Sequence, residues 1–171
     1  LQTVGRDEKI AVDALVDEVL ADLEPLAQEK NVELIQKTQN LRDEKAENKT
    51  ADLILTGSDI LIYRMLYNLV ENAIKYNKPG GWVHVTLNAD HQYFYLKVED
   101  SGIGIPEDSL EHIYERFYRV DKSHSREIGG TGLGLAITRN AVLMHRGAIK
   151  VFSTEGEGTI FNVRIPLNYI A

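Results

Sequence analysis

Residues 58–76 read SDILIYRMLYNLVENAIKY. Apolar residues recur through this stretch every three or four positions, which is the spacing of a helix with one buried face. They are Ile62, Met65, Leu66, Leu69, Val70, Ala73 and Ile74. The segment NKPGG at 77–81 then supplies the proline and glycines that end a helix. The stretch predicts a long amphipathic helix that packs its apolar side on a core.

The opposite side of this predicted helix carries Asn68, Asn72 and Lys75 almost in line. A solvent-exposed face is the simplest explanation for charged residues there. Asparagine is a poor helix former, however, and two asparagines one turn apart beside a lysine suit a site for a metal ion bound to phosphate. Both interpretations stay open from this helix alone.

Strand patterns surround the helix on both sides. We expect further helices at 12–30 and 132–145, the second ending at Gly147, and strands at 31–37, 53–56, 82–88, 93–100, 148–153 and 159–166. A helical stretch is also expected after Pro106. Strands that cluster with few helices between them predict an α+β fold, a two-layer α/β sandwich whose mixed, largely antiparallel sheet carries helices on one face. The 171 residues suit a single domain over 1–171, with a lead-in at 1–9.

The strand expected at 93–100 ends in a carboxylate that faces inward. Phe94, Leu96 and Val98 share one side of the strand, and strict alternation puts Asp100 on the same side. A buried carboxylate is costly unless a donor meets it. The segment SGIGIP at 101–106 follows, and its glycines allow a ligand to approach the backbone closely. This pattern predicts an acceptor for the amino group of a base; an Asx turn held by Asp100 is the alternative.

A glycine-rich segment, GGTGLGL at 129–135, leads directly into the helix expected at 132–145. Free amides at a helix N-terminus cradle phosphates, although the spacing fits neither a Walker loop nor a dinucleotide fingerprint. Near the end of the chain, Thr159 shares its side of a strand with Phe161 and Val163. It is either a second polar group in the same pocket or a satisfied core threonine.

Composition excludes several classes of protein. The net charge of −7 argues against a broad nucleic-acid-binding surface. Cysteine is absent, which excludes disulfides, zinc thiolates and a cysteine nucleophile. No apolar run approaches the roughly 20 residues of a membrane span. The chain begins with Leu1 rather than Met, so we expect a soluble piece of a longer protein.

Five segments resemble, in order, the motifs of one family. NLVENAIKY at 68–76 resembles the N box of sensor histidine kinases, and VEDSGIGIP at 98–106 their first glycine box. ERFYRVD at 115–121 resembles the F box, GTGLGLAI at 130–137 the second glycine box, and GEGTIF at 156–161 the closing motif. The chain thus resembles the catalytic ATP-binding domain of a bacterial two-component sensor histidine kinase, of the Bergerat fold shared with gyrase B.

The resemblance implies a role for each matching residue. Asn72 would ligate Mg²⁺ and Asn68 would support the same site, while Lys75 would contact phosphate and Tyr76 would pack at the nucleotide. Asp100 would accept a hydrogen bond from the adenine amino group of ATP.

The remaining roles belong to the pocket floor, the phosphate loop and a lid. Thr159 would assist Asp100 through water, and Gly102 and Gly104 would floor the adenine pocket. A mobile ATP lid would run from about 106 to 131, with Arg119 as the cation near the terminal phosphate. The phosphates would be served by Gly130, Thr131, Gly132, Leu133 and Gly134.

The resemblance also implies a reaction and partners. The chain would bind Mg²⁺-ATP and transfer the γ-phosphate to a histidine on a separate dimerisation domain, and a response regulator would follow. None of its five histidines precedes an acidic residue, so the isolated chain, a monomer, should not phosphorylate itself. We expect a cytoplasmic domain without membrane or nucleic-acid contact, in a membrane-anchored parent.

Two other functions remain. One is a Bergerat ATPase or an anti-sigma serine kinase; the other is a nucleotide-binding module without catalysis. The ATPase relatives carry a glutamate one turn before the metal-binding asparagine, and here that position is Asn68, which cannot act as a general base. The resemblance therefore favours phosphotransfer over hydrolysis.

Overall fold

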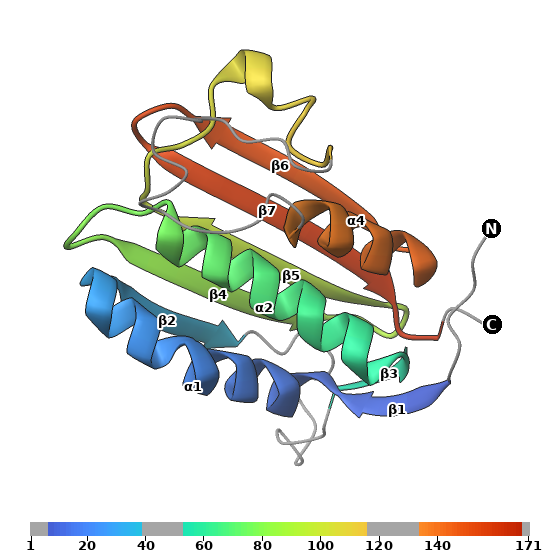
Figure 1. Ribbon diagram of the computed structural model, residues 1–171. Helices are drawn as coiled ribbons and strands as arrows, with labels where there is room; N and C mark the ends of the chain where they lie inside the picture. Colours follow the sequence, from blue (N-terminus) through green and yellow to red (C-terminus); the bar gives the residue numbers. More distant parts are fainter. Residues whose placement is uncertain (1–6, 39–52, 116–133, 169–171) are drawn as a thin grey trace.

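The computed structural model describes residues 7–38, 53–115 and 134–168. Within these ranges the chain forms two layers, with α1, α2 and α4 lying on one face of a sheet (Figure 1). In chain order the elements are β1 (Glu8–Ala11), α1 (Val12–Lys30), β2 (Glu33–Thr38), β3 (Ile54–Gly57), α2 (Asp59–Lys75), β4 (Trp82–Ala89), β5 (Tyr93–Asp100), the 3₁₀ turn η1 (Glu107–Ser109), α4 (Gly134–Met144), β6 (Ala148–Thr154) and β7 (Gly158–Pro166).

The main sheet has five strands in the order β2-β4-β5-β7-β6. β2 pairs with β4 in parallel, and the other neighbours are antiparallel. The predicted α+β sandwich with a mixed, largely antiparallel sheet is therefore confirmed. β3 does not join this sheet but pairs with β1, a strand that the sequence analysis did not predict. Four residues, EKIA, are too few to display an alternating pattern.

The apolar arc of α2 forms the centre of the core. All seven residues of the predicted arc are buried, and α2 packs between α1 and α4 above the sheet. Ser58 begins the helix, since its Oγ accepts a hydrogen bond from the Leu61 backbone N–H at 3.4 Å. Burial alternates along β4 and β5, so one side of the sheet faces the helices and the other faces solvent.

Two local expectations were wrong. Gly147 was expected to cap the last helix, but Arg146 takes the left-handed conformation, with φ of 58°. Gly147 is needed for close packing instead, because a Cβ there would lie 2.5 Å from the Arg164 carbonyl oxygen. The helix expected after Pro106 is only the short η1. Of the helices in the described ranges, none is both long and apolar enough to cross a membrane.

Candidate functional site

Three predicted site residues lie along the half-buried side of α2. The Asn68 side-chain amide donates to the Gly134 carbonyl at 3.3 Å, which joins it to the first turn of α4. Lys75 forms an ion pair with Glu71 at 3.6 Å. Within the described ranges the Asn72 side chain makes no hydrogen bond, so its oxygen is available to a ligand. Of these three residues, only Asn72 has a side chain that forms no hydrogen bond or ion pair within the described ranges.

Asp100 ends β5 on the core-facing side, as the alternation predicted. Its Oδ1 accepts the backbone N–H of Gly102 at 2.8 Å, so the Asx-type turn that was the alternative is present. A carboxylate has capacity for several hydrogen bonds, and this one can still accept from a ligand. Burial raises the pKa of Asp100 to about 6, against the opposing effect of the backbone N–H groups of Gly102 and Thr159. At pH 7 the group is mainly an ionised acceptor.

Thr159 lies directly opposite Asp100 in the β5–β7 register and is buried. Its hydroxyl contacts the hydroxyl of Ser153 on β6 at 2.9 Å. Ser153 Oγ also accepts the Ile105 backbone N–H at 2.7 Å and donates to the Gly158 carbonyl at 2.9 Å. Ser153 thus ties the glycine loop to the β6–β7 hairpin. Ser153 was not among the predicted site residues, although it shares its side of β6 with Val151 and Ile149.

The loop after Asp100 is wedged between α2 and the β6–β7 hairpin. A Cβ on Gly102 would lie 2.3 Å from the Tyr76 carbonyl oxygen, and that oxygen accepts the Ile103 backbone N–H at 3.0 Å. Gly104 has φ of 71°, and a Cβ there would lie 2.2 Å from the Thr154 carbonyl oxygen. Both glycines are therefore required by close backbone approach. Tyr76 is the residue that ends α2.

These groups converge at one end of the molecule. The C-terminal turns of α2, the end of β5 and the start of β7 meet on the left side of Figure 1. Gly134 begins α4. Five predicted phosphate and lid residues lie outside the described residues: Arg119, Gly130, Thr131, Gly132 and Leu133. Of the predicted lid, the structure describes only 106–115, which contains η1.

The arrangement offers two kinds of chemistry side by side. Asp100 supplies a half-buried acceptor suited to an exocyclic amino group, and Asn72 on α2 supplies an amide oxygen suited to a hard cation. In the described ranges no group of three or more His, Asp or Glu side chains is placed to hold a metal ion alone. A cation at Asn72 would need most of its ligands from phosphate oxygens and water.

A family model described as histidine kinase-, DNA gyrase B-, and HSP90-like ATPase matches residues 57–169. The chain belongs to this family. The sensor histidine kinase RppB of Synechocystis sp. is 42% identical over 125 residues, which cover 73% of this chain and 28% of RppB. The sensor histidine kinase WalK of Bacillus subtilis is 38% identical over 150 residues, covering 86% of this chain and 23% of WalK. The chain spans about a quarter of the length of these curated relatives.

Solved structures agree with this assignment of the ATPase domain. The nucleotide-free catalytic domain of the histidine kinase ThkA superposes with a TM-score of 0.77 and 26% identity, covering 96% of this chain and 97% of that domain. The family inferred from the five motifs and the sandwich fold are both confirmed.

Proposed function

We propose that this ATPase domain binds Mg²⁺-ATP and is the catalytic domain of a sensor histidine kinase. The γ-phosphoryl group would pass from ATP to an imidazole nitrogen of a histidine on a separate dimerisation domain, with ADP as the leaving group. The observation that carries the proposal is the inward Asp100 carboxylate, half-buried at the floor of a glycine loop and facing Thr159.

The adenine end of the proposed site is built from the loop after β5. Asp100 accepts from the exocyclic amino group, and Thr159 assists through water. Gly102 and Gly104 let this loop pack directly against the backbone of Tyr76 and Thr154. In this proposal the loop backbone, held there beside Asp100, forms the floor under a flat ring. Tyr76, at the end of α2, packs beside the nucleotide.

The phosphate end is assigned to α2 and to the glycine-rich segment before α4. Asn72 would hold Mg²⁺ through its side-chain oxygen, in keeping with the one or two protein ligands that this ion usually takes. When bound, the ion bridges phosphate oxygens and offsets their charge. Lys75, Gly134 and the residues from 130 to 133 contact the phosphates, and Arg119 lies near the terminal one in this proposal.

Two features on α2 favour transfer over hydrolysis. Asn68 stands where the ATPase relatives carry a glutamate base, and an amide cannot take a proton from water. The neighbouring carboxylate on α2, Glu71, is held by Lys75 at 3.6 Å. A water near Asn68 would therefore meet an amide and an ion-paired carboxylate on α2.

The partners of the proposed kinase are its own phosphoacceptor helices and a response regulator. The domain would act in the cytoplasm as a monomer within a longer, membrane-anchored sensor, and residues from about 106 to 131 would close over ATP as a lid. No nucleic acid or lipid is needed for this role.

The test is a phosphotransfer assay. The chain is mixed with the phosphoacceptor helices of its own parent protein and with γ-labelled ATP, and acid-labile phosphate on those helices is measured. We expect label on the helices and none on this chain alone. Steady release of inorganic phosphate without labelled helices would show an ATPase instead.

A further inference from the structure

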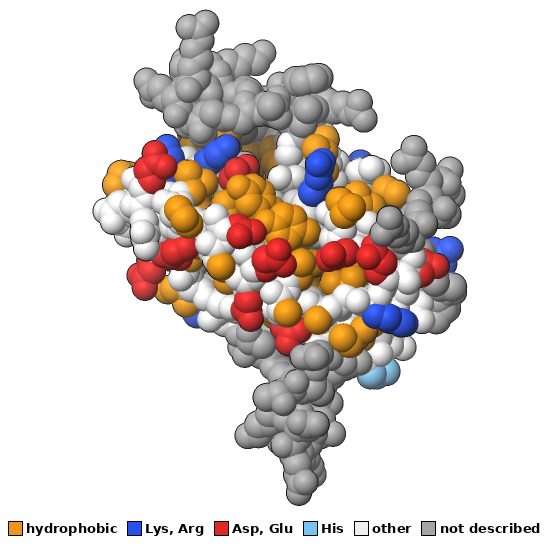
Figure 2. Space-filling view, turned by 60° about the horizontal axis from the view of Figure 1, so that its bottom comes forward, with side chains coloured by type: hydrophobic (Ala, Val, Ile, Leu, Met, Phe, Trp, Pro, Cys, Tyr) orange, Lys and Arg blue, Asp and Glu red, His pale blue; other side chains and the backbone are white. Residues whose placement is uncertain are grey.

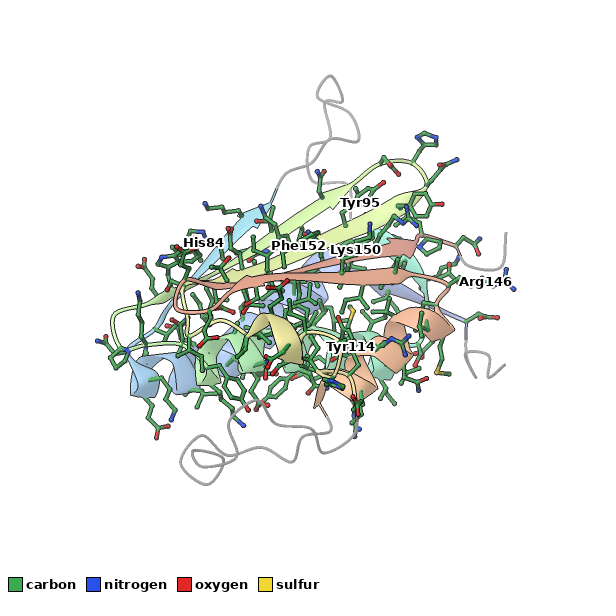
Figure 3. All side chains as sticks on the ribbon, turned by 90° about the horizontal axis from the view of Figure 1, so that it is seen from above. His84, Tyr95, Tyr114, Arg146, Lys150 and Phe152 are labelled. Atoms are coloured by element: carbon green, nitrogen blue, oxygen red, sulfur yellow. The ribbon has the colours of Figure 1, made fainter. Side chains whose placement is uncertain are left out.

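On the side of the main sheet away from the helices, side chains are arranged by chemical type. These side chains form rows across the strands, because paired residues point to the same side. Figure 3 shows His84, Tyr95, Lys150 and Phe152 on this side of the sheet. We call it the open face.

One row of the open face is basic. Lys37, Thr86, Lys97, Asn162 and Lys150 are successive partners from β2 to β6. Arg164, two residues along β7 from Asn162, adds a fourth cation. With Tyr95 and Asn88, it borders a hollow of about 420 Å³ that also reaches Lys97 and Lys150.

The adjacent row is mostly apolar. It consists of Ile35, His84, Glu99, Ile160 and Phe152. Phe152 is 55% exposed, which is unusual for a phenylalanine on a sheet surface. The His84 ring stacks on Trp82 at 4.1 Å between centroids, which widens the apolar surface.

The charge of the open face is opposite to that of the chain. The whole chain carries −7, whereas the open-face positions of the five strands carry four cations and two acids, Glu33 and Glu99. Glu99 lies 4.0 Å from Lys97, a distance that leaves this lysine only weakly paired. Acidic side chains gather instead on the face over α1 (Figure 2). A sheet face that only contacts water has no need for cations on one side of the molecule and acids on the other.

We propose that the open face docks an amphipathic, acidic helix of a partner protein. Neighbouring strands are about 4.8 Å apart, so Lys37, Lys97 and Lys150, on every second strand, are spaced by roughly 10 Å. Seven residues of an α-helix, nearly two turns, advance by roughly 10.5 Å. A helix lying across the strands with a carboxylate at every seventh residue would meet all three lysines. Its apolar stripe would cover Ile160 and Phe152 in the row beside them.

The probe for this surface is a synthetic 18-residue helical peptide with glutamate at every seventh position and leucines on the adjacent stripe. Binding to the whole chain is measured by fluorescence anisotropy and mapped by amide chemical shifts. We expect micromolar affinity that falls about tenfold between low and high salt. The largest shifts should lie along the row from Lys37 to Lys150, which crosses all five strands.

Charge reversals on the open face and on the helical layer distinguish specific docking from general electrostatic attraction of the peptide to the chain. Lys97→Glu/Lys150→Glu should weaken peptide binding at least about tenfold, and Phe152→Ser about threefold or more. The control Lys30→Glu/Arg64→Glu changes the net charge equally on the helical layer and should stay within about twofold. Equal losses in both double variants would overturn the proposal. So would a peptide of the same composition but scrambled order that binds as well, or inorganic polyphosphate that binds while the peptide does not.

The affinity of an ATP analogue should be unchanged in all of these variants. The open face lies on the side of the sheet opposite α2, the helix that carries Asn72, so docking there does not depend on the nucleotide site. Failure of peptide docking would therefore leave the proposed kinase function standing, and failure of ATP binding would leave the docking surface standing.

Discussion

The Nε2 atom of His145 accepts a hydrogen bond from the backbone N–H of Ser58 at 3.0 Å, joining the end of α4 to the start of α2. The other ring nitrogen, Nδ1, lies 2.7 Å from the Ala141 carbonyl oxygen and must donate to it, so the ring is neutral. At the other end of α4, Asn68 donates to Gly134. The helix that follows the glycine-rich segment is thus fastened to the helix that carries Asn72 at both of its ends.

His145→Ala should lower the free energy of unfolding by about 2–4 kcal/mol. The ring is fully buried, so its loss leaves a cavity and also leaves the Ser58 N–H without a partner. Urea unfolding followed by circular dichroism measures the change. His91→Ala, in the exposed turn between β4 and β5, is the control and should change stability by less than about 0.5 kcal/mol. A loss under about 1 kcal/mol at His145 would contradict this role.

The same histidine predicts a loss of stability on acidification. Burial lowers its pKa below the usual 6.5, so the folded chain holds its proton less tightly than the unfolded chain. The contribution is fully present above pH 6.5 and is lost as pH falls through the folded pKa. Unfolding experiments from pH 8 to pH 5 should show a steeper fall for the native chain than for His145→Gln. Parallel curves would show that His145 does not titrate in this range.

Asn72→Ala should reduce phosphotransfer far more than it reduces nucleotide binding. It removes one oxygen from the proposed Mg²⁺ site, whereas the adenine contacts at Asp100 remain. We expect transfer to fall at least about 100-fold and affinity for ADP without Mg²⁺ to change less than about threefold. Phosphotransfer to the acceptor helices and calorimetry of ADP binding give the two values. Arg64→Ala, on an exposed turn of the same helix, is the control. Normal transfer by Asn72→Ala would refute the metal assignment.

Much of the fold and the site could be predicted because the elements that carry the site, α2 and β5, are long enough to show a clear helical or alternating pattern. The buried arc of α2 and the alternation of β5 placed Asn72 and Asp100 correctly on their elements. What the sequence could not provide were contacts between distant segments. Ser153 and His145 have ordinary neighbours in sequence, and their roles arise only where β6 meets the glycine loop and where α4 meets α2.

The glycines also show that a sequence alone does not reveal contacts between separate segments. Gly102 and Gly104 were predicted to leave room for a ligand, and the structure gives each a packing reason as well, against Tyr76 and Thr154. Gly147 was expected at a helix cap, whereas it lies against the Arg164 carbonyl on β7, the second strand of the hairpin that follows it. A glycine in a sequence indicates close approach or special backbone geometry, and only tertiary structure distinguishes them.

Asp100→Asn should stabilise the chain at pH 7 by about 1–3 kcal/mol. The pKa of Asp100 is raised to about 6, so the folded state binds a proton that the unfolded state has already released between roughly pH 4 and pH 6. The native chain therefore loses stability relative to the asparagine variant as pH rises through that window, and the gap is constant above it. Urea unfolding of both proteins at pH 3.5, 5 and 7 tests this. A gap that does not grow with pH would show that the carboxylate is not penalised by burial.

The last prediction concerns the choice of base at Asp100. Adenine presents an amino group where guanine presents a carbonyl, so guanine would set two acceptors against each other in a half-buried site. An unmet buried polar group costs about 1–3 kcal/mol, which corresponds to roughly ten- to hundredfold weaker binding of guanine nucleotides.

Asparagine at this position can turn its amide and donate to the carbonyl of guanine. Asp100→Asn should therefore weaken adenine binding and reduce the preference to within about threefold, although the variant is the more stable protein. Protonation should act in the same direction, since a neutral carboxyl is a weaker acceptor, and adenine affinity should fall below about pH 6 in the native chain only. Calorimetry of ADP and GDP with both proteins at pH 5 and pH 7.5 separates these effects. Equal affinities of the native chain for the two nucleotides at pH 7.5 would remove Asp100 from base recognition.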